Sequence, residues 1–321
     1  MTCWIERWAT AAMVLFLSLS ALPAHAARGV ATERVVGEEQ NLEDLFVEAS
    51  DAFGVPVEIL MALGYTESRW NMRDGAPSID FAYGIMGLRE RDDIDTLGFA
   101  AELLDLPRER LKRNPRANIF GAAAVLEALA KNYYQFEVES VRELSLEAWE
   151  PVLREYSGMP DATTYVLQLY TPIHRGIDTM NDAGERIHFG PVKIDLASFE
   201  EIEPRDKVFS QDYPPAAWDP AASCNYTWSE RPASYPIEMV VIHVTQGSYA
   251  GTISWFKNCS AGASAHYVIR SSDGAVTQMV GNGSIAWHAG NWDYNTRSIG
   301  IEHEGFISEC SWFTDAMYRS S

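Results

Sequence analysis

Apolar residues recur with a helical period over the first half of the chain, from about residue 41 to residue 175. Gly54 follows the first of these stretches and Pro115 precedes another, and both residues are typical of helix ends. We therefore predict helices over 41–54, 55–68, 118–134, 145–158 and 161–174.

The pattern changes beyond residue 237, where apolar and polar residues begin to alternate. Such alternation predicts strands, and it occurs over 238–245, 264–280 and 297–305. Asp273 and Gly274 interrupt the middle segment and indicate a hairpin turn. Residues 252–258 between the first two segments have a helical pattern.

These patterns, and a length of 321 residues, predict two domains of different class. The first is an all-α, lysozyme-like domain over 41–185. A segment rich in proline and acidic residues follows over 186–235 and is typical of a linker or of an arm docked on a domain. The last part, 236–321, is predicted to be an incomplete α/β domain with a mixed sheet flanked by helices.

Composition narrows the range of partners. The formal net charge is −20, with 45 acidic and 25 basic residues. Nucleic-acid binding requires clustered Lys and Arg, so this charge argues against a nucleic-acid partner. Aromatic residues make up 12% of the chain and suit either a carbohydrate-binding surface or well-filled cores.

The first 26 residues have the pattern of a secretory signal peptide. Arg7 precedes an apolar run, and Ala24-His25-Ala26 fits a signal-peptidase site. The apolar run is shorter than a membrane span. We therefore expect a secreted, monomeric protein without a membrane anchor, beginning at Ala27. The remaining cysteines, Cys224, Cys259 and Cys310, allow one disulfide without specifying which pair forms it.

Glu67 lies near the end of an apolar predicted helix. Partial desolvation there would raise the pKa of its carboxyl group, as protonation of a glycosidic oxygen requires. A lone glutamate at a helix end is more often simply solvated. Here, however, four blocks follow in order: Glu67-Ser68-Arg69, Gly84 to Leu88, Asn118 to Gly121, and Glu155 to Gly158.

In this order the blocks resemble those of soluble lytic transglycosylases, of the lysozyme-like superfamily. The resemblance implies that Glu67 is the acid and base of glycan-strand cleavage, and that Met86 and Tyr156 line the saccharide cleft. Tyr156 could donate a hydrogen bond to Glu67. Asp74 or Asp80 would be the second carboxylate if the enzyme were a hydrolysing lysozyme, and Ser157 departs from the family pattern.

Four histidines, His243, His266, His288 and His303, lie within about 60 residues of the strand-rich part. A single histidine on a strand is more often a core residue than a metal ligand, but four beside Glu302 and Glu304 favour a hydrolytic metal centre. The surrounding sequences are 240–245, 264–269, 286–290 and 298–302. In that order they resemble type-2 N-acetylmuramoyl-L-alanine amidases.

This resemblance implies zinc-dependent cleavage of the amide between N-acetylmuramic acid and L-alanine. His243 would be the first Zn²⁺ ligand, Glu302 the general base, and Trp287 and His288 would shape the substrate groove. The family's other ligands lie beyond a helix that residues 312–318 resemble, and the sequence ends at Ser321. Cys310 is a poor substitute because it precedes that helix. The resemblance thus implies a truncated domain with an incomplete zinc site and uncovered apolar strands, such as Val240 to Val244.

Together the two resemblances predict a secreted peptidoglycan hydrolase whose partner is the cell wall, its glycan strand and its stem peptide. An incomplete zinc site is also typical of recognition proteins with this fold. The alternative is therefore a peptidoglycan-binding protein without turnover, or an inert remnant.

Overall fold

The computed structural model describes residues 41–135, 141–159, 162–200, 210–229, 231 and 235–321. The predicted signal peptide, 1–26, lies outside these residues. Residues Gly37–Ser321 cluster into one compact unit. Within the described ranges, no helix is both long and apolar enough to cross a membrane.

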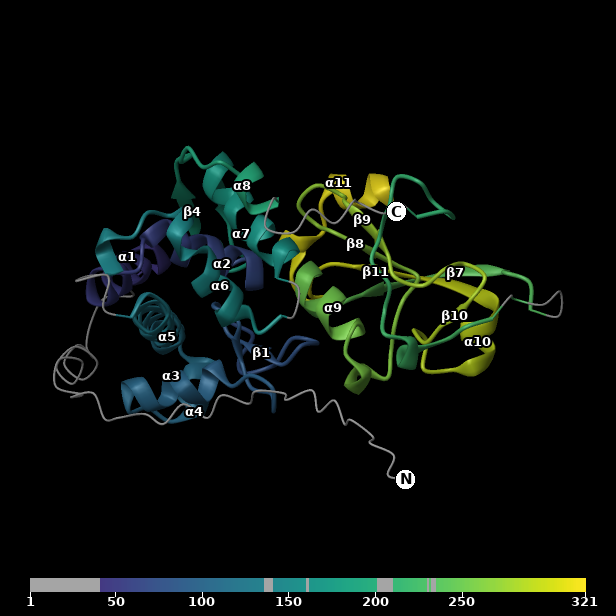
Figure 1. Ribbon diagram of the computed structural model, residues 1–321, viewed down its shortest axis with the longest axis horizontal. Coiled ribbons are helices and arrows are strands. Elements are labelled where there is room, and N and C mark those ends of the chain that lie inside the picture. Colours follow the sequence, from purple (N-terminus) through teal and green to yellow (C-terminus); the bar gives the residue numbers. More distant parts are fainter. Residues whose placement is uncertain (1–40, 136–140, 160–161, 201–209, 230, 232–234) are drawn as a thin grey trace, which may run out of the picture. The chain divides into compact units, whose positions relative to one another are not determined.

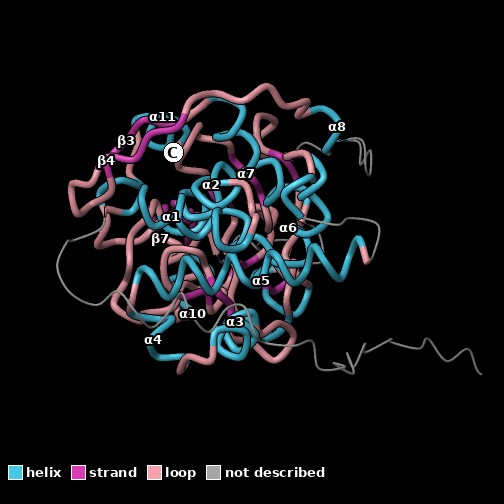
Figure 2. The backbone as a smooth tube through the Cα atoms, turned by 90° about the vertical axis from the view of Figure 1, so that its left-hand side faces the viewer, coloured by secondary structure: helices cyan, strands magenta, loops and turns pink. Residues whose placement is uncertain are grey.

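Helices dominate the described residues up to position 200 (Figures 1 and 2). They are α1 (Leu42–Phe53), α2 (Val57–Ser68), α3 (Thr96–Leu104), α4 (Arg108–Arg113), α5 (Pro115–Tyr134), α6 (Glu150–Ser157), α7 (Thr163–Arg175) and α8 (Ala197–Glu200). Short 3₁₀ turns lie at Val141–Glu143 and Glu147–Trp149. All five predicted helices are present.

The ends of these helices follow from local chemistry. Asn41 caps α1, because its side chain accepts a hydrogen bond from the Asp44 amide, and Gly54 ends the helix with a φ of 73°. Asn114 caps α5 in the same way, ahead of Pro115 at the first turn. Helix α2 is buried almost all round, which places Glu67 inside the protein.

This helical half also contains two small antiparallel sheets. It is therefore not the all-α domain that the sequence predicted. Strand β1 (Ala82–Tyr83) pairs with β2 (Leu88–Arg89), and β3 (Ile177–Met180) pairs with β4 (Arg186–Phe189). The first pair is too short to give an alternating pattern. The second straddles residue 185, where we placed the end of the domain.

The strand-rich half is built on a five-stranded mixed sheet in the order β5-β9-β8-β11-β7. The strands are β5 (Ala217–Trp218), β7 (Met239–Val244), β8 (Tyr267–Ile269), β9 (Val276–Gln278) and β11 (Ser298–His303). Strand β11 runs parallel to both β7 and β8, whereas β8 and β9 are antiparallel across the predicted turn at Asp273-Gly274.

Three short helices accompany this sheet: α9 (Tyr249–Phe256), α10 (Trp292–Arg297) and α11 (Asp315–Ser320). Helix α9 is the predicted helix, and its Ile253 and Phe256 share a buried apolar cluster with Val268 of β8. At the edge of the sheet, Val240 and Ile242 of β7 are 57% and 51% exposed. Apolar residues of β7 therefore face solvent, as the sequence predicted for this strand.

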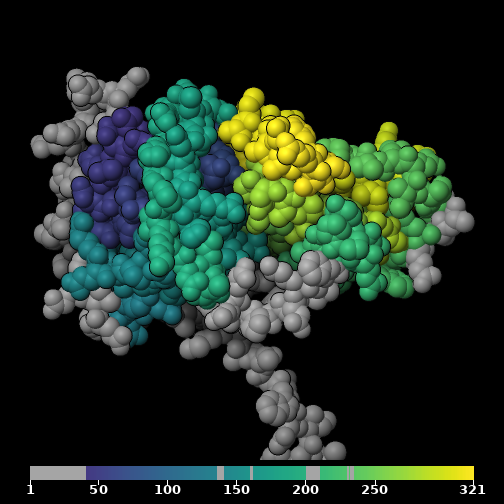
Figure 3. All heavy atoms as spheres, turned by 90° about the horizontal axis from the view of Figure 1, so that it is seen from above, coloured from purple at the N-terminus to yellow at the C-terminus, as the bar shows by residue number. Residues whose placement is uncertain are grey.

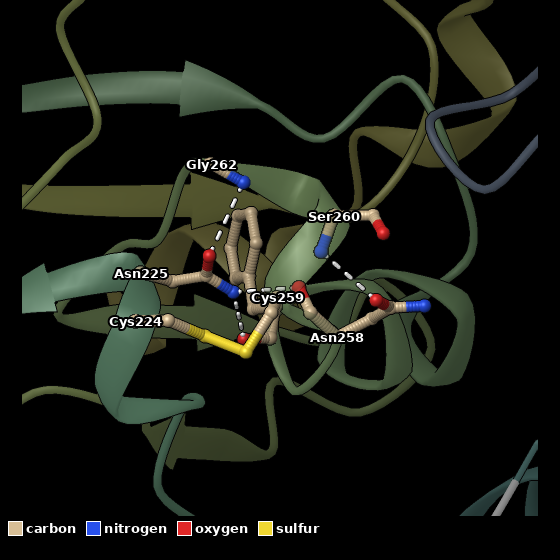
Figure 4. Close-up of a disulfide and its surroundings, with 7 residues drawn as sticks. Cys224, Asn225, Asn258, Cys259, Ser260 and Gly262 are labelled. Atoms are coloured by element: carbon tan, nitrogen blue, oxygen red, sulfur yellow. Dashed lines mark hydrogen bonds between the residues drawn. A yellow bond between two sulfur atoms is a disulfide. The ribbon is translucent and has the colours of Figure 1, made fainter.

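Of the two interpretations of 186–235, the described segments fit the docked arm and not the free linker. Strand β5 belongs to the main sheet, and β6 (Tyr226–Thr227) pairs with β10 (Ile285–Ala286). A disulfide joins Cys224 to Cys259, and the Asn225 amide donates to the carbonyls of Phe256 and Asn258 (Figure 4). These bonds fix the segment to the end of α9. Strands of two residues amid prolines have no periodicity that would reveal them.

The two halves are joined by a buried carboxylate. Glu304, just after β11, is fully buried and accepts hydrogen bonds from Gln168 Nε2 of α7, the Tyr249 amide and the Ser271 amide at 2.7–2.8 Å. Such charge-assisted bonds are stronger than neutral ones. Glu304 therefore has a structural role.

Candidate active site

In the helical half, Glu67 lies at the end of α2, as predicted, and is 3% exposed. Arg89 Nη2 lies 3.1 Å from its Oε1, and the Tyr165 hydroxyl donates to Oε1 at 2.9 Å. Burial raises the pKa of Glu67, and the Arg89 guanidinium opposes that rise. A raised pKa suits a proton donor, whereas the ion pair stabilises the charged form.

Asp80 shares the same arginine. Its Oδ2 lies 3.1 Å from Arg89 Nη2, and Arg89 Nε donates to it as well. The Arg89 charge lowers the pKa of Asp80 against the effect of burial. Asp74, the other candidate, is exposed and pairs with Arg113. The structure therefore brings Asp80 and Glu67 together around one guanidinium and leaves Asp74 apart.

Met86 and Tyr156 are both fully buried, so neither lines an open surface in this structure. The Tyr156 hydroxyl donates to the Met86 carbonyl at 2.7 Å, and the bond to Glu67 comes from Tyr165 instead. Gly87 makes the close packing here possible, because an added Cβ would lie 2.5 Å from Glu67 Cδ. Its φ of +64° also disfavours other residues.

In the strand-rich half, His243 of β7 and Glu302 of β11 are direct neighbours in register. Paired residues on adjacent strands point to the same face of a sheet, so the two side chains share a face. Glu302 is 8% exposed, and its buried Oε2 has no hydrogen-bond partner. Burial raises the pKa of Glu302 to about 8. A carboxyl group with this pKa is mostly protonated at pH 7, and the deprotonated form that can accept a proton grows as the pH rises toward 8.

His288 lies over the same face. Its Nδ1 is 2.9 Å from His243 Nε2, and its Nε2 is 3.0 Å from the Ser298 hydroxyl. An added Cβ at Gly300 would lie 2.4 Å from the His288 ring, so glycine is required beneath it. Burial lowers the pKa of His288 to about 4, with His243 adding to the effect. His288 is therefore neutral at pH 7, and one of the two imidazoles donates to the other.

The remaining predicted residues have different surroundings. Trp287 is half-buried, and its indole N–H donates to Thr227 at 3.0 Å. His266 is fully buried, where its Nδ1 accepts from the Gly300 amide and Arg231 Nη2 lies 2.8 Å from its Nε2. His303 is buried beneath Tyr318. His266 and His303 thus belong to the core.

The donor set tests whether zinc fits. Among the described residues, no three His, Cys, Asp or Glu side chains are grouped so that they could hold a metal ion. His243 has His288 as its nearest imidazole partner, and Cys310 is exposed and separate. Tight zinc sites take three or more protein ligands. The described residues therefore do not complete a zinc site.

Comparisons with known proteins support the predicted resemblance of the strand-rich half to amidases. Residues 233–321 match the family model of the N-acetylmuramoyl-L-alanine amidases. The match begins within a few residues of the predicted boundary at 236. This part of the chain is amidase-like.

N-acetylmuramoyl-L-alanine amidase A of Achromobacter lyticus is 48% identical over 110 residues. The matched region covers 34% of this chain and 59% of that protein. No solved structure matches the chain. The resemblance of residues 41–175 to lytic transglycosylases stays a prediction.

Sequence reasoning missed two residues around Glu67, Arg89 and Tyr165, and also Arg231, which contacts the core residue His266. Arg89 directly follows the block ending at Leu88, but an arginine on a short strand is usually solvated. Tyr165 lies 98 positions from Glu67, and Arg231 lies 35 from His266. No local pattern indicates such contacts.

The buried His266 should make stability depend on pH. Burial, with Arg231 adding to it, lowers the pKa of His266 to about 3 in the folded state. In the unfolded state the pKa returns to about 6.5, so the unfolded chain binds the proton and stability falls as pH drops below that value. One such group lowers the free energy of unfolding by about 1.4 kcal/mol per pH unit, or by about 2 kcal/mol between pH 6.5 and pH 5.

Guanidinium unfolding at pH 7.5 and pH 5.0 measures this loss. In His266→Gln the loss should be smaller by about 2 kcal/mol, because the other histidines are common to both proteins. An identical loss in both proteins would assign the pH dependence to another group.

Proposed function

We propose that this protein is a secreted peptidoglycan hydrolase whose residues 233–321 cleave the amide between N-acetylmuramic acid and L-alanine. The unpartnered, buried Glu302 carboxylate beside His243 carries this proposal, and the amidase match of the same segment supports it. Export rests on the signal-peptide pattern of residues 1–26.

In this proposal Glu302 takes a proton from the water that attacks the amide carbonyl, and later returns it to the leaving amine. His243 Nε2 and His288 Nδ1 bond each other and His288 Nε2 meets the Ser298 hydroxyl, so the two neutral imidazoles hold each other in place beside Glu302. Zn²⁺ supplies Lewis acidity to this chemistry in the family. His243 is the proposed first ligand, but the described residues do not complete the site, so no step here depends on the metal.

Digestion of purified wall tests the amidase. Full-length protein, with and without added Zn²⁺, should release peptides that begin with a free L-alanine amine, which amine labelling followed by mass spectrometry detects. Binding to the wall without new amines would support the alternative, a non-catalytic peptidoglycan-binding protein. That alternative is favoured by the incomplete metal site.

We also propose that the helical half cleaves the glycan strand, with Glu67 as acid and base. Its support is the buried carboxyl group with a raised pKa at the end of α2 and the Tyr165 contact. In the described state Arg89 holds the carboxylate. Proton donation therefore requires Arg89 to release Glu67.

Glu67→Gln tests this second activity. The change is nearly isosteric but removes the proton donor, so we expect a loss on the order of 10²–10⁴-fold in rate. Chromatography of digested wall should show 1,6-anhydro-muropeptides from the parent protein and none from the variant. Equal amounts from both proteins would exclude Glu67 as the catalytic acid.

A further inference from the structure

A cavity of about 680 Å³ lies where three segments that are distant in the sequence meet. Its walls come from the loop after α2, the β3–β4 turn and the segment after β11. In Figure 3 dark-blue, teal and yellow surfaces, the colours of these segments, adjoin. The volume lies in the usual range for small-molecule and peptide sites.

Arg73 lines this cavity with an incompletely bonded guanidinium. Its Nε and Nη1 atoms are buried and have no hydrogen-bond partner, and Nη2 makes only a 3.5 Å contact with the Ala82 carbonyl. The guanidinium stacks on the Phe306 ring, 3.9 Å from its centroid. No carboxylate of the described residues forms an ion pair with it. Arg73 as a whole is half-buried, but desolvated N–H groups without a partner are costly, so the guanidinium favours an arriving anion.

Three carboxylates line the same cavity: Asp182, Glu185 and Glu309. Their bonds come from neutral donors. Asn71 Nδ2 donates to both Asp182 and Glu309, Trp312 Nε1 donates to Glu309, and Asn181 Nδ2 donates to Glu185. No Lys or Arg within the described ranges forms an ion pair with any of the three. Arg73 and Glu309 attract each other electrostatically, but no direct ion pair joins Arg73 to any of the three carboxylates.

We propose that this cavity binds a zwitterionic peptide, with the peptide carboxylate on Arg73 and its ammonium group among Asp182, Glu185 and Glu309. A simple anion would meet three negative charges, and a simple cation would leave Arg73 unpaired. The planar guanidinium can hold a carboxylate through two parallel N–H bonds once its buried Nε or Nη1 turns into the cavity. A ligand carrying both charges satisfies both sets of groups.

The source of such a ligand rests on the proposed function. Before amide cleavage the stem peptide has an acylated N terminus, and cleavage turns it into a free ammonium group. The released peptide therefore carries an N-terminal ammonium group together with its carboxylates, whereas the intact substrate has no charge at that end. The cavity is accordingly a product-binding site, separate from Glu302 and His243.

Isothermal titration of the full-length protein with the tripeptide L-Ala–γ-D-Glu–L-Lys tests the proposal. We expect saturable binding, weakened on the order of tenfold or more by Arg73→Met. N-acetylated and C-amidated forms of the same peptide should each bind correspondingly less well, because each lacks one of the two terminal charges while the D-Glu carboxylate and the Lys ammonium are unchanged. Arg113→Met, which removes an exposed neighbouring arginine, is the matched control and should bind as the parent does.

Folding is checked independently of binding. Because Arg73 has no direct ion pair and Met can pack on the Phe306 ring in its place, Arg73→Met should stay folded and unfold close to the parent's temperature. Equal binding by Arg73→Met, equal binding of the capped peptides, or no binding by the parent would each overturn the proposal. The titration needs no turnover, so a missing amidase activity would leave its result unchanged.

Discussion

Glu302→Gln is expected to reduce amide cleavage on the order of 10²–10⁴-fold while leaving the protein folded. The amide fills nearly the same volume as the carboxylate but cannot accept a proton. The readout is the rate at which free L-alanine amines appear in digests of purified wall. Unfolding temperatures of parent and variant should agree closely, because Oε2 has no bond to lose.

Two neighbouring glutamates provide the controls. Glu304→Gln removes a carboxylate that accepts three hydrogen bonds, so this variant should lose about 1.5–3 kcal/mol of stability for each weakened charged bond. Glu238→Gln breaks an exposed ion pair with Arg297 and should change neither rate nor stability measurably. A Glu302→Gln variant with the parent's rate would remove Glu302 from the mechanism.

Arg89→Met is expected to destabilise the protein by about 3–5 kcal/mol, the usual cost of removing one partner from a buried ion pair. Arg89 is completely buried and serves both Glu67 and Asp80. Without it, two carboxylates would remain in the core without a cation. Urea unfolding at pH 7.5 measures the loss.

If the Arg89→Met variant is destabilised by two unneutralised carboxylates, its loss of stability should change with pH and with substitutions that remove those charges. In Arg89→Met the buried carboxylates would have folded pKa values above their unfolded values, so protonation on going to pH 5 should recover part of the stability. Adding Glu67→Gln and Asp80→Asn should recover part of it as well, since no charge then remains buried. Arg113→Met, at an exposed pair, should cost no more than about 1 kcal/mol. A similar loss of stability for both arginine variants would contradict the interpretation that Arg89 neutralises the two buried carboxylates of Glu67 and Asp80.

Periodicity identified the helices and main strands because each pattern is local. A 3.6-residue repeat between Asn41 and Gly54 leaves few alternatives to a helix, and alternation over 297–305 similarly predicts β11. The short strands β1, β5 and β6 have only two residues each, so their pairing depends on partners far along the chain. For this reason the sequence could not decide between a linker and a docked arm over 186–235.

Residue types identified where acid, base and imidazole chemistry would lie, but not how each group is bonded. Glu302 and Glu304 stand two positions apart on the same segment, and nothing in their local sequence separates them. The tertiary structure leaves Oε2 of Glu302 without a partner and surrounds Glu304 with three donors. A residue's role that depends on desolvation and on partners from distant segments is decided only when the chain folds. Glu67 is a second example, because no local sequence pattern predicts its contacts with Arg89 and Tyr165.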